Sequence, residues 1–170
     1  MNKVIPKKAL GQHFLRDKNI VRKIIQLITP LPFETILEIG PGTGILTQEL
    51  LTLSNPIEAV EIDKESVQFL QTRFNAPHLQ IIHQNILNFS LWQKHYFFVG
   101  NLPYNISSPI LFYLLENRNK CRKAVFMLQR EVAERIVAKP GSKTYGILSV
   151  LLGAYYDCQI AFYVPATAFL

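Results

Sequence analysis

The sequence predicts an α/β fold, a doubly wound and mostly parallel sheet with helices on both faces. Short runs of almost continuously apolar residues, typical of buried parallel strands, alternate along the chain with stretches whose apolar residues have helical spacing. The 170 residues match one ordinary domain, and no internal repeat or low-complexity linker divides them. The βαβα order of these segments is the pattern of a doubly wound sheet.

The apolar runs predict the strands. They are Thr35–Ile39, Ile57–Glu61, Leu79–Ile82, Tyr96–Val99, Ala124–Leu128 and a last strand around Gln159–Val164. Helical spacing predicts the helices, which are Asn19–Ile28, Leu46–Leu53, Lys64–Phe74, Ser108–Glu116, Arg130–Ala138 and Tyr145–Tyr155. Asp63, Ser107 and Gln129 stand near the starts of three of these helices.

Composition is that of a soluble, folded protein. Apolar residues make up 49% of the chain, and no apolar run approaches the roughly 20 residues of a membrane-spanning helix. The polar N-terminus carries no secretion signal, so we expect a cytoplasmic protein without a membrane partner. Cys121 and Cys158 lie far apart and outside any Cys-x-x-Cys spacing, which supports neither a disulfide framework nor a metal site.

The positive charge is concentrated at the N-terminus. The formal net charge is +6, and residues 1–23 hold seven Lys or Arg against Asp17 alone, whereas the rest of the chain is balanced. A localised basic arm indicates a polyanionic partner. The alternative is a solvated charged face, which is the commoner meaning of a charge run taken alone. The polyanionic partner is favoured only if a catalytic or binding site lies next to the basic arm.

A glycine-rich motif, Glu38–Gly44, stands where the first strand turns into the next helix. Glycine lets the backbone approach a ligand closely. Glu61 follows about 20 residues later, at the end of the second strand, where a carboxylate can accept both hydroxyls of a ribose. The motif alone is often only a tight loop, but together with Glu61 it predicts a nucleoside cofactor. Its Gly-x-Gly-x-Gly spacing departs from Gly-x-Gly-x-x-Gly, which disfavours a dinucleotide.

A second motif, Asn101-Leu102-Pro103-Tyr104, follows the fourth strand and resembles the Asn-Pro-Pro-Tyr signature of amino-methyltransferases. The lone pair of an adenine amine is delocalised into the ring, so a methylating site must localise it. The Asn101 oxygen and a carbonyl of Leu102 or Pro103 could accept the two amine hydrogens, while Tyr104 stacks on the base. The alternative is a plain Asn-x-Pro turn, which the position after a cofactor turn disfavours.

The chain also resembles one known family over essentially its whole length. The motifs that carry this resemblance occur in order and are Gly11–Asp17, Glu38–Gly44, Asn101–Tyr104 and Leu128–Arg135. They are similar to those of KsgA-type small-subunit rRNA adenine-N6 dimethyltransferases, and Pro140–Val150 resembles this branch more than the erythromycin-resistance methylases. The resemblance implies a Rossmann-like class I fold that binds S-adenosylmethionine. It also implies dimethylation of two adjacent adenosines in the 3′-terminal hairpin of 16S rRNA, with the 30S subunit precursor as partner.

The resemblance assigns roles by position. One set would bind the cofactor: Gln12, His13, Leu15, Gly40, Gly42, Glu61, Ile62, Asn85, Ile86 and Asn101. A second set would hold the target base: Asn101, Leu102, Pro103, Tyr104 and Phe169. Glu61 would hold the ribose, and Ile62 and Ile86 would enclose the cofactor adenine. The family usually has an aspartate at the position of Asn85, and an uncharged acceptor is expected to reduce cofactor affinity. Direct attack on the methyl group requires no metal.

The family continues beyond a phenylalanine like Phe169 with a final antiparallel strand and a small helical domain. We therefore expect residues 1–170 to be the catalytic domain alone, with a basic arm and helix at 1–28 and an α/β core at 35–170. The missing strand would lie between Ala124–Leu128 and Gln159–Val164. An empty position there predicts self-association or a displaced segment 159–170, with an intact cofactor cleft.

Two functions of other classes remain open. A nicotinamide oxidoreductase would share the first βαβ units, but it leaves Asn101–Tyr104 and the basic arm without a role. A non-catalytic RNA-binding assembly factor would keep the fold and the cleft. The intact Asn-x-Pro-Tyr motif disfavours this second alternative, whereas Asn85 is compatible with it.

Overall fold

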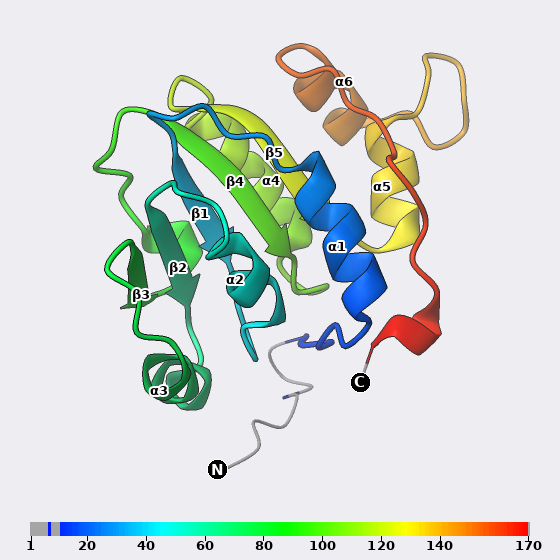
Figure 1. The fold of residues 1–170 in the computed structure, drawn as a ribbon. Helices are drawn as coiled ribbons and strands as arrows, with labels where there is room; N and C mark the ends of the chain where they lie inside the picture. The colour runs from blue at the N-terminus through cyan, green and yellow to red at the C-terminus, as the bar shows by residue number, and fades with distance from the viewer. Residues whose placement is uncertain (1–6, 8–10, 170) are drawn as a thin grey trace.

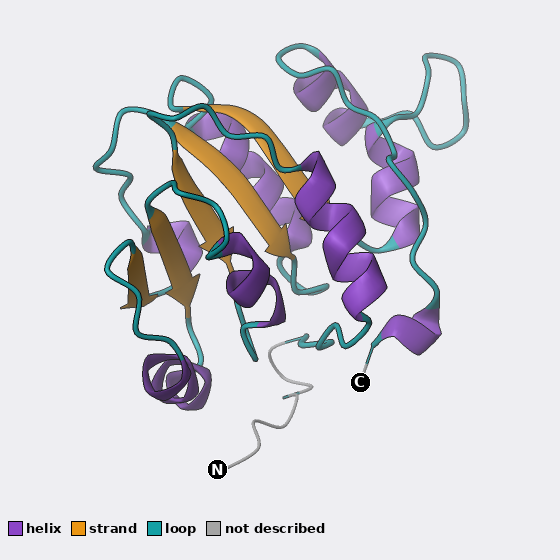
Figure 2. Ribbon diagram, viewed as in Figure 1, coloured by secondary structure: helices purple, strands orange, loops and turns teal. Residues whose placement is uncertain are grey.

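Five parallel strands form a single sheet in the order β3-β2-β1-β4-β5. The computed structural model describes Lys7 and residues 11–169. The strands are β1 (Thr35–Ile39), β2 (Ile57–Glu61), β3 (Leu79–His83), β4 (Tyr96–Asn101) and β5 (Cys121–Met127). Figures 1 and 2 show helices in front of this sheet and behind it. The predicted α/β fold with a parallel sheet is confirmed.

The helices lie where helical spacing predicts them. They are α1 (Lys18–Leu27), α2 (Ile45–Leu50), α3 (Lys64–Arg73), α4 (Ser107–Glu116), α5 (Arg130–Ile136) and α6 (Ile147–Gly153), with short 3-10 turns η2 (Ile86–Asn88) and η3 (Ala166–Ala168). Asp17 and Asp63 cap α1 and α3, because their carboxylates accept the N–H groups of Asn19 and Ser66 at 2.8 Å and 3.2 Å. Gln129 precedes α5 without a capping bond. In the described part of the chain, no helix is long and apolar enough to cross a membrane.

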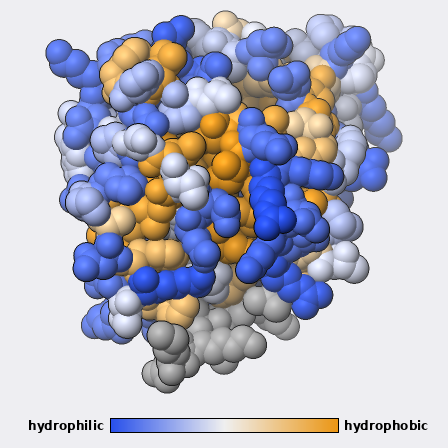
Figure 3. Space-filling view, in the orientation of Figure 1, coloured by the Kyte–Doolittle hydropathy of each residue, from blue (hydrophilic) through white to orange (hydrophobic). Residues whose placement is uncertain are grey.

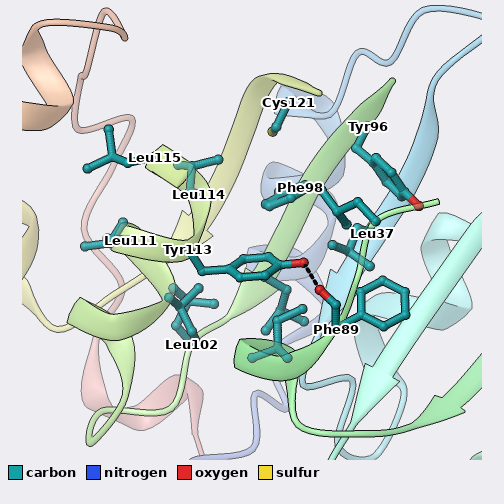
Figure 4. Packing of buried hydrophobic residues seen from close by; sticks show 14 of the residues in the cluster. Leu37, Phe89, Tyr96, Phe98, Leu102, Leu111, Tyr113, Leu114, Leu115 and Cys121 are labelled. Atoms are coloured by element: carbon teal, nitrogen blue, oxygen red, sulfur yellow. Dashed lines mark hydrogen bonds between the residues drawn. The ribbon is translucent and has the colours of Figure 1, made fainter. Parts of the chain in front are cut away.

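Side chains alternate along the central strands into two hydrophobic clusters, one on each face. Ile36 and Phe97 pack with α1 and α2, whereas Leu37 and Phe98 pack with α4 and α6 (Figure 4). Each of these four side chains is at most 1% exposed. In the space-filling view, hydrophobic residues show in the middle of the face that carries α1 and α2, inside a hydrophilic rim (Figure 3). Burial of both faces explains the almost continuously apolar strands.

The predicted strand Gln159–Val164 does not form. Among the described residues, no backbone hydrogen bond joins residues 157–164 to another backbone group. Burial nevertheless alternates with a period of two, since Phe162 and Val164 are partly buried whereas Tyr163 is exposed. The segment runs past α5 toward the C-terminus (Figure 1). The prediction was wrong because apolar alternation indicates only that an extended chain buries one face. A chain can bury one face without pairing its backbone with a neighbouring strand.

β5 is therefore an open edge of the sheet rather than one side of a gap between two strands. It begins at Cys121, three residues before the predicted start, because the exposed charges of Arg122 and Lys123 hide its first half from an apolar pattern. Charged side chains on an edge strand disfavour pairing with other chains. In the part of the chain that the structure describes, every strand of the sheet is parallel to its neighbours. Self-association through this edge stays a prediction.

Candidate functional site

The predicted motifs meet at the carboxyl edge of the sheet. Because the strands are parallel, the turn after β1, the end of β2 and the end of β4 lie side by side. A cavity of about 220 Å³ opens there. Ten of the predicted residues line it, namely Gln12, His13, Gly40, Gly42, Glu61, Ile62, Asn85, Asn101, Leu102 and Pro103. Residues of the glycine-rich motif Glu38–Gly44, Glu61 and residues of the motif Asn101–Tyr104 thus line one cavity.

The glycine turn holds its shape against the N-terminal segment. Gly42 has a φ of 56°, and a Cβ there would lie 2.8 Å from the ring of Phe14. Only glycine allows this close approach in a left-handed backbone conformation. Phe14 is itself only 6% exposed, so its ring packs tightly against the turn.

The Glu61 carboxylate is fixed by backbone N–H groups. Its Oε2 accepts from Gly42 at 3.0 Å, and its Oε1 accepts from Ile62 and Asp63, each at 2.9 Å. Burial raises the pKa of Glu61, and these three backbone donors counteract that rise. The turn and the end of β2 are therefore joined through one carboxylate that lies on the cavity wall.

Glu38 lies beneath the turn and is 1% exposed. Thr47 donates its hydroxyl to Glu38 Oε2 at 2.7 Å. Burial raises the pKa of Glu38 to about 8, the bond from Thr47 counteracts the rise, and the nearby charge of Glu61 adds to it. Burial therefore favours the protonated form of this carboxyl. Glu38 borders a second, smaller pocket of about 40 Å³ on the other side of the turn, together with Leu15.

The wall next to Glu61 differs in one residue from the predicted set. Ile62 is 46% exposed and lines the cavity, but Ile86 is buried in the hydrophobic core and Leu87 lines the cavity instead. The 3-10 turn η2 turns these two side chains in different directions. Asn85 caps this turn, since its Oδ1 accepts the N–H of Leu87 at 3.0 Å. The oxygen that was predicted to meet the cofactor thus already has one partner.

Hydrogen bonds fix the motif Asn101–Tyr104 at the end of β4. Leu102 donates its N–H to the Met127 carbonyl at 3.0 Å, and Ile106 donates to the Pro103 carbonyl at 3.2 Å. Asn101 donates its Nδ2 to the carbonyl of His13 at 2.7 Å. Tyr104 does not line either cavity. Its ring stacks on the imidazole of His13, with centroids 4.5 Å apart and planes 28° apart.

Lys7 of the N-terminal segment makes ion pairs and a hydrogen bond with residues around the site. Lys7 Nζ contacts Asp63 Oδ1 at 2.6 Å and Glu65 Oε1 at 3.1 Å, and the Lys7 N–H donates to Gln12 Oε1 at 2.9 Å. The bonds from both carboxylates raise the pKa of Lys7. Burial favours a raised pKa for Asp63, but the bonds from Lys7 and Ser66 outweigh it and lower the pKa. Of the basic arm, Lys3 and Lys8 lie outside the described residues.

Phe169 pairs with the N-terminal segment. It forms an isolated antiparallel bridge with Leu15, and Arg16 donates its N–H to the Ala168 carbonyl at 2.8 Å. Phe169, like Tyr104, lines neither pocket, and its predicted place at the target base stays a prediction. Its partner segment is the same one that holds His13 and Phe14.

Several cavity residues were not predicted. They are Gly11, Phe14, Leu87, Asn105 and Ile106. Gly11 and Phe14 belong to the motif Gly11–Asp17, so the sequence contained a signal for them. Leu87 and Ile106 are ordinary apolar residues, and only the path of the chain brings them to the cavity.

Comparison with known proteins identifies a family. Residues 5–170 match the family described as Ribosomal RNA adenine dimethylase. Two curated proteins with the name Ribosomal RNA small subunit methyltransferase A are similar. The protein of Francisella tularensis subsp. novicida is 44% identical over 96% of this chain and 65% of its own length. The protein of Parabacteroides distasonis is 45% identical over 99% of this chain and 65% of its own length. The chain thus spans about 65% of these relatives.

Two solved structures are similar as well. A dimethyladenosine transferase from Plasmodium falciparum has a TM-score of 0.75 and 30% identity, covering 83% of this chain and 52% of that one. The 23S rRNA methyltransferase ErmE has a TM-score of 0.65 and 28% identity, covering 72% of this chain and 50% of that one. Both agree with the Rossmann-like methyltransferase fold.

Proposed function

The chain belongs to the ribosomal RNA adenine dimethylase family, and we propose that it transfers methyl groups from S-adenosylmethionine to adenine N6. The proposed targets are the two adjacent adenosines of the 3′-terminal hairpin of small-subunit rRNA. The supporting observation is the shared cavity, because Glu61 and Asn101 line the same space of about 220 Å³. A cofactor and an amine held by these residues would meet there. We extend the proposal to ribosome biogenesis in the cytoplasm, with residues 1–170 as the catalytic domain.

The residues around the glycine turn fit a nucleoside cofactor. The backbone bonds to Glu61 fix its carboxylate, and Oε2 keeps acceptor capacity for a ribose hydroxyl, since it accepts one N–H and has about two lone pairs, whereas Oε1 already accepts two. Gln12 and Gly40 would hold the methionine end, and Ile62 and Leu87 would enclose the adenine. When bound, S-adenosylmethionine supplies an electrophilic methyl group on its sulfonium sulfur. Asn85 shares its oxygen with η2 and carries no charge, which supports a weaker hold on the cofactor adenine.

The acceptor side localises the lone pair of the target amine. Asn101 turns its Nδ2 toward His13, so its Oδ1 is left to accept one N6 hydrogen. The Pro103 carbonyl already accepts from Ile106, which favours the Leu102 carbonyl as the second acceptor. Tyr104 would stack on the base and offset about 1–3 kcal/mol of its unstacking cost. The role of Phe169 at the target base stays a prediction.

The decisive experiment measures cofactor binding and methyl transfer on the same protein. Calorimetry gives the affinity for S-adenosylmethionine, and tritium from its labelled methyl group is followed into undermethylated small ribosomal subunits. Tyr104→Ala should keep cofactor affinity and lose most of the transfer. Tyr145→Ala is the matched control, because Tyr145 is 38% exposed and lies outside the cavity. Transfer by Tyr104→Ala at the parental rate would refute the acceptor assignment.

The same measurement separates the two alternatives. An assembly factor without catalytic activity binds the cofactor and the subunit but transfers no tritium. An oxidoreductase binds a nicotinamide cofactor in place of S-adenosylmethionine. Either result from the parental chain would overturn the proposal.

A further inference from the structure

His13 contacts both polar ends of the proposed acceptor motif. Its carbonyl accepts Nδ2 of Asn101 at 2.7 Å, while its ring stacks on Tyr104 at a centroid distance of 4.5 Å. A carbonyl oxygen can only accept, so this bond fixes which way the Asn101 amide points. The main chain of His13 therefore orients the acceptor oxygen, and its side chain covers the tyrosine.

The imidazole stacks on one face of Tyr104, and the carbonyl of the same residue contacts Asn101. In the proposed function the target adenine stacks on Tyr104 while its amine donates to the Asn101 oxygen. Imidazole and adenine are both flat aromatic rings, and one Tyr104 face accommodates only one of them in a stack. A base that stacks on the face covered by His13 must therefore exchange with its ring.

We propose that His13 is a positioning residue whose ring, in the free protein, occupies the stacking position of the target base on Tyr104. Its ring stacks on Tyr104 until the base enters and then turns aside. This inference rests on the proposed function. It differs from the role by resemblance, in which His13 serves the cofactor, and the two roles predict different measurements.

The main chain on both sides of His13 is closely packed. On one side of His13, Phe14 is 6% exposed and packed against Gly42. On the other side, Gly11 has a φ of 62°, and a Cβ there would lie 2.7 Å from the Asn105 side chain. Both flanks of His13 are held, so rotation of the side chain is the available motion. The bond from its carbonyl to Asn101 persists when the ring leaves.

Two substitutions with opposite expected effects test the exchange. In His13→Ala the face of Tyr104 is free, and the apparent KM for undermethylated small subunits should fall about two- to tenfold, as expected for loss of one competing stacked pair. In His13→Phe a more apolar ring competes, and the KM should rise. Cofactor affinity by calorimetry should stay within about twofold in both, because the main chain is unchanged.

Other outcomes overturn the proposal. If His13 serves the cofactor, both variants weaken cofactor binding and leave the KM for the subunit unchanged. If it is only structural, both KM values move in the same direction or neither moves.

A measurement on the free protein keeps this test apart from the test of the proposed function. Failure of that function appears as a parental chain without methyl transfer. The imidazole proton resonances of His13 can be assigned by their loss in His13→Phe, since the chain has only four histidines. They should move in Tyr104→Leu, and they should move in the same way when adenosine is added up to its solubility limit. Resonances that stay in place in either experiment overturn the inference, whether or not the chain methylates RNA.

Discussion

Residues 34–101 and residues 121–169 both contain extended apolar segments, but these segments differ in whether they pair with neighbouring strands. In the first region, β1, β2 and β4 each have a strand on both sides. In the second, β5 is an edge strand and residues 157–164 have no ladder partner among the described residues. Several exposed apolar side chains also belong to the second region, namely Tyr145, Ile147, Val150, Tyr155 and Tyr163. An apolar pattern thus predicts conformation, whereas pairing depends on what lies next to the segment.

The largest expected difference between the regions is in core packing. Phe98→Ala should lower the free energy of unfolding by about 3–5 kcal/mol, because Phe98 is fully buried and the sheet cannot collapse around the space. Phe162→Ala should cost only about 1 kcal/mol, since Phe162 is partly buried in a segment without backbone bonds. Equilibrium urea unfolding followed by circular dichroism measures both. Equal losses would show that residues 157–164 belong to the same cooperative core.

The second expected difference is in pH dependence. The buried carboxylates are all in the first region or at its edge, and burial raises the pKa of Glu38 to about 8. The folded state holds this proton where the unfolded state releases it. The stability that Glu38 contributes is therefore full below its unfolded pKa and is lost as the pH rises toward its folded pKa. The free energy of unfolding should fall by about 2–3 kcal/mol between about pH 5 and about pH 7.

Glu38→Gln is the variant that isolates this effect. A glutamine keeps an acceptor for the Thr47 hydroxyl but does not titrate. Its unfolding curve should lose most of the fall with pH, and it should be the more stable protein at alkaline pH. If the parental pH profile persists in Glu38→Gln, other groups cause it.

The third difference concerns glycines. Gly44→Ala should cost about 2–3 kcal/mol, because Gly44 has a φ of 75° and a Cβ there would lie 2.4 Å from Phe74. Gly153→Ala is the matched control in the second region, at the end of α6 with no atom within 4 Å of the added Cβ. It should be neutral or stabilise by up to about 1 kcal/mol. The shift of the urea midpoint gives both values, and a tolerated Gly44→Ala would contradict the tight packing of the turn.

The smallest difference concerns two tyrosine hydroxyls that donate to backbone carbonyls. Tyr113 donates to Phe89 at 2.7 Å in the buried core (Figure 4), and Tyr156 donates to Cys121 at 3.0 Å in a partly buried place. Tyr113→Phe leaves a buried carbonyl without its donor and should cost about 1–2 kcal/mol. Tyr156→Phe should cost about 0.5 kcal/mol, because this hydrogen bond is only partly buried. Thermal unfolding of the two variants decides the order, and a larger loss for Tyr156→Phe would reverse the comparison.

The sequence by itself determined the elements and most of the site. β1 and β2 begin and end at the predicted residues, because a strand buried on both faces has an almost continuous apolar run. Gly42, Glu61 and Asn101 reach one cavity because parallel strands end at the same edge, which follows from the βαβ order alone.

Only the tertiary structure decided pairing, and with it the contacts of individual side chains. Residues 157–164 have the alternation of a strand but no ladder, since a strand requires a neighbour with free backbone groups as well as a buried face. Tertiary packing also decided that Leu87 rather than Ile86 lines the cavity, and that Phe169 pairs with Leu15. The stack of His13 on Tyr104 joins residues far apart in the chain, and no local pattern records such a contact.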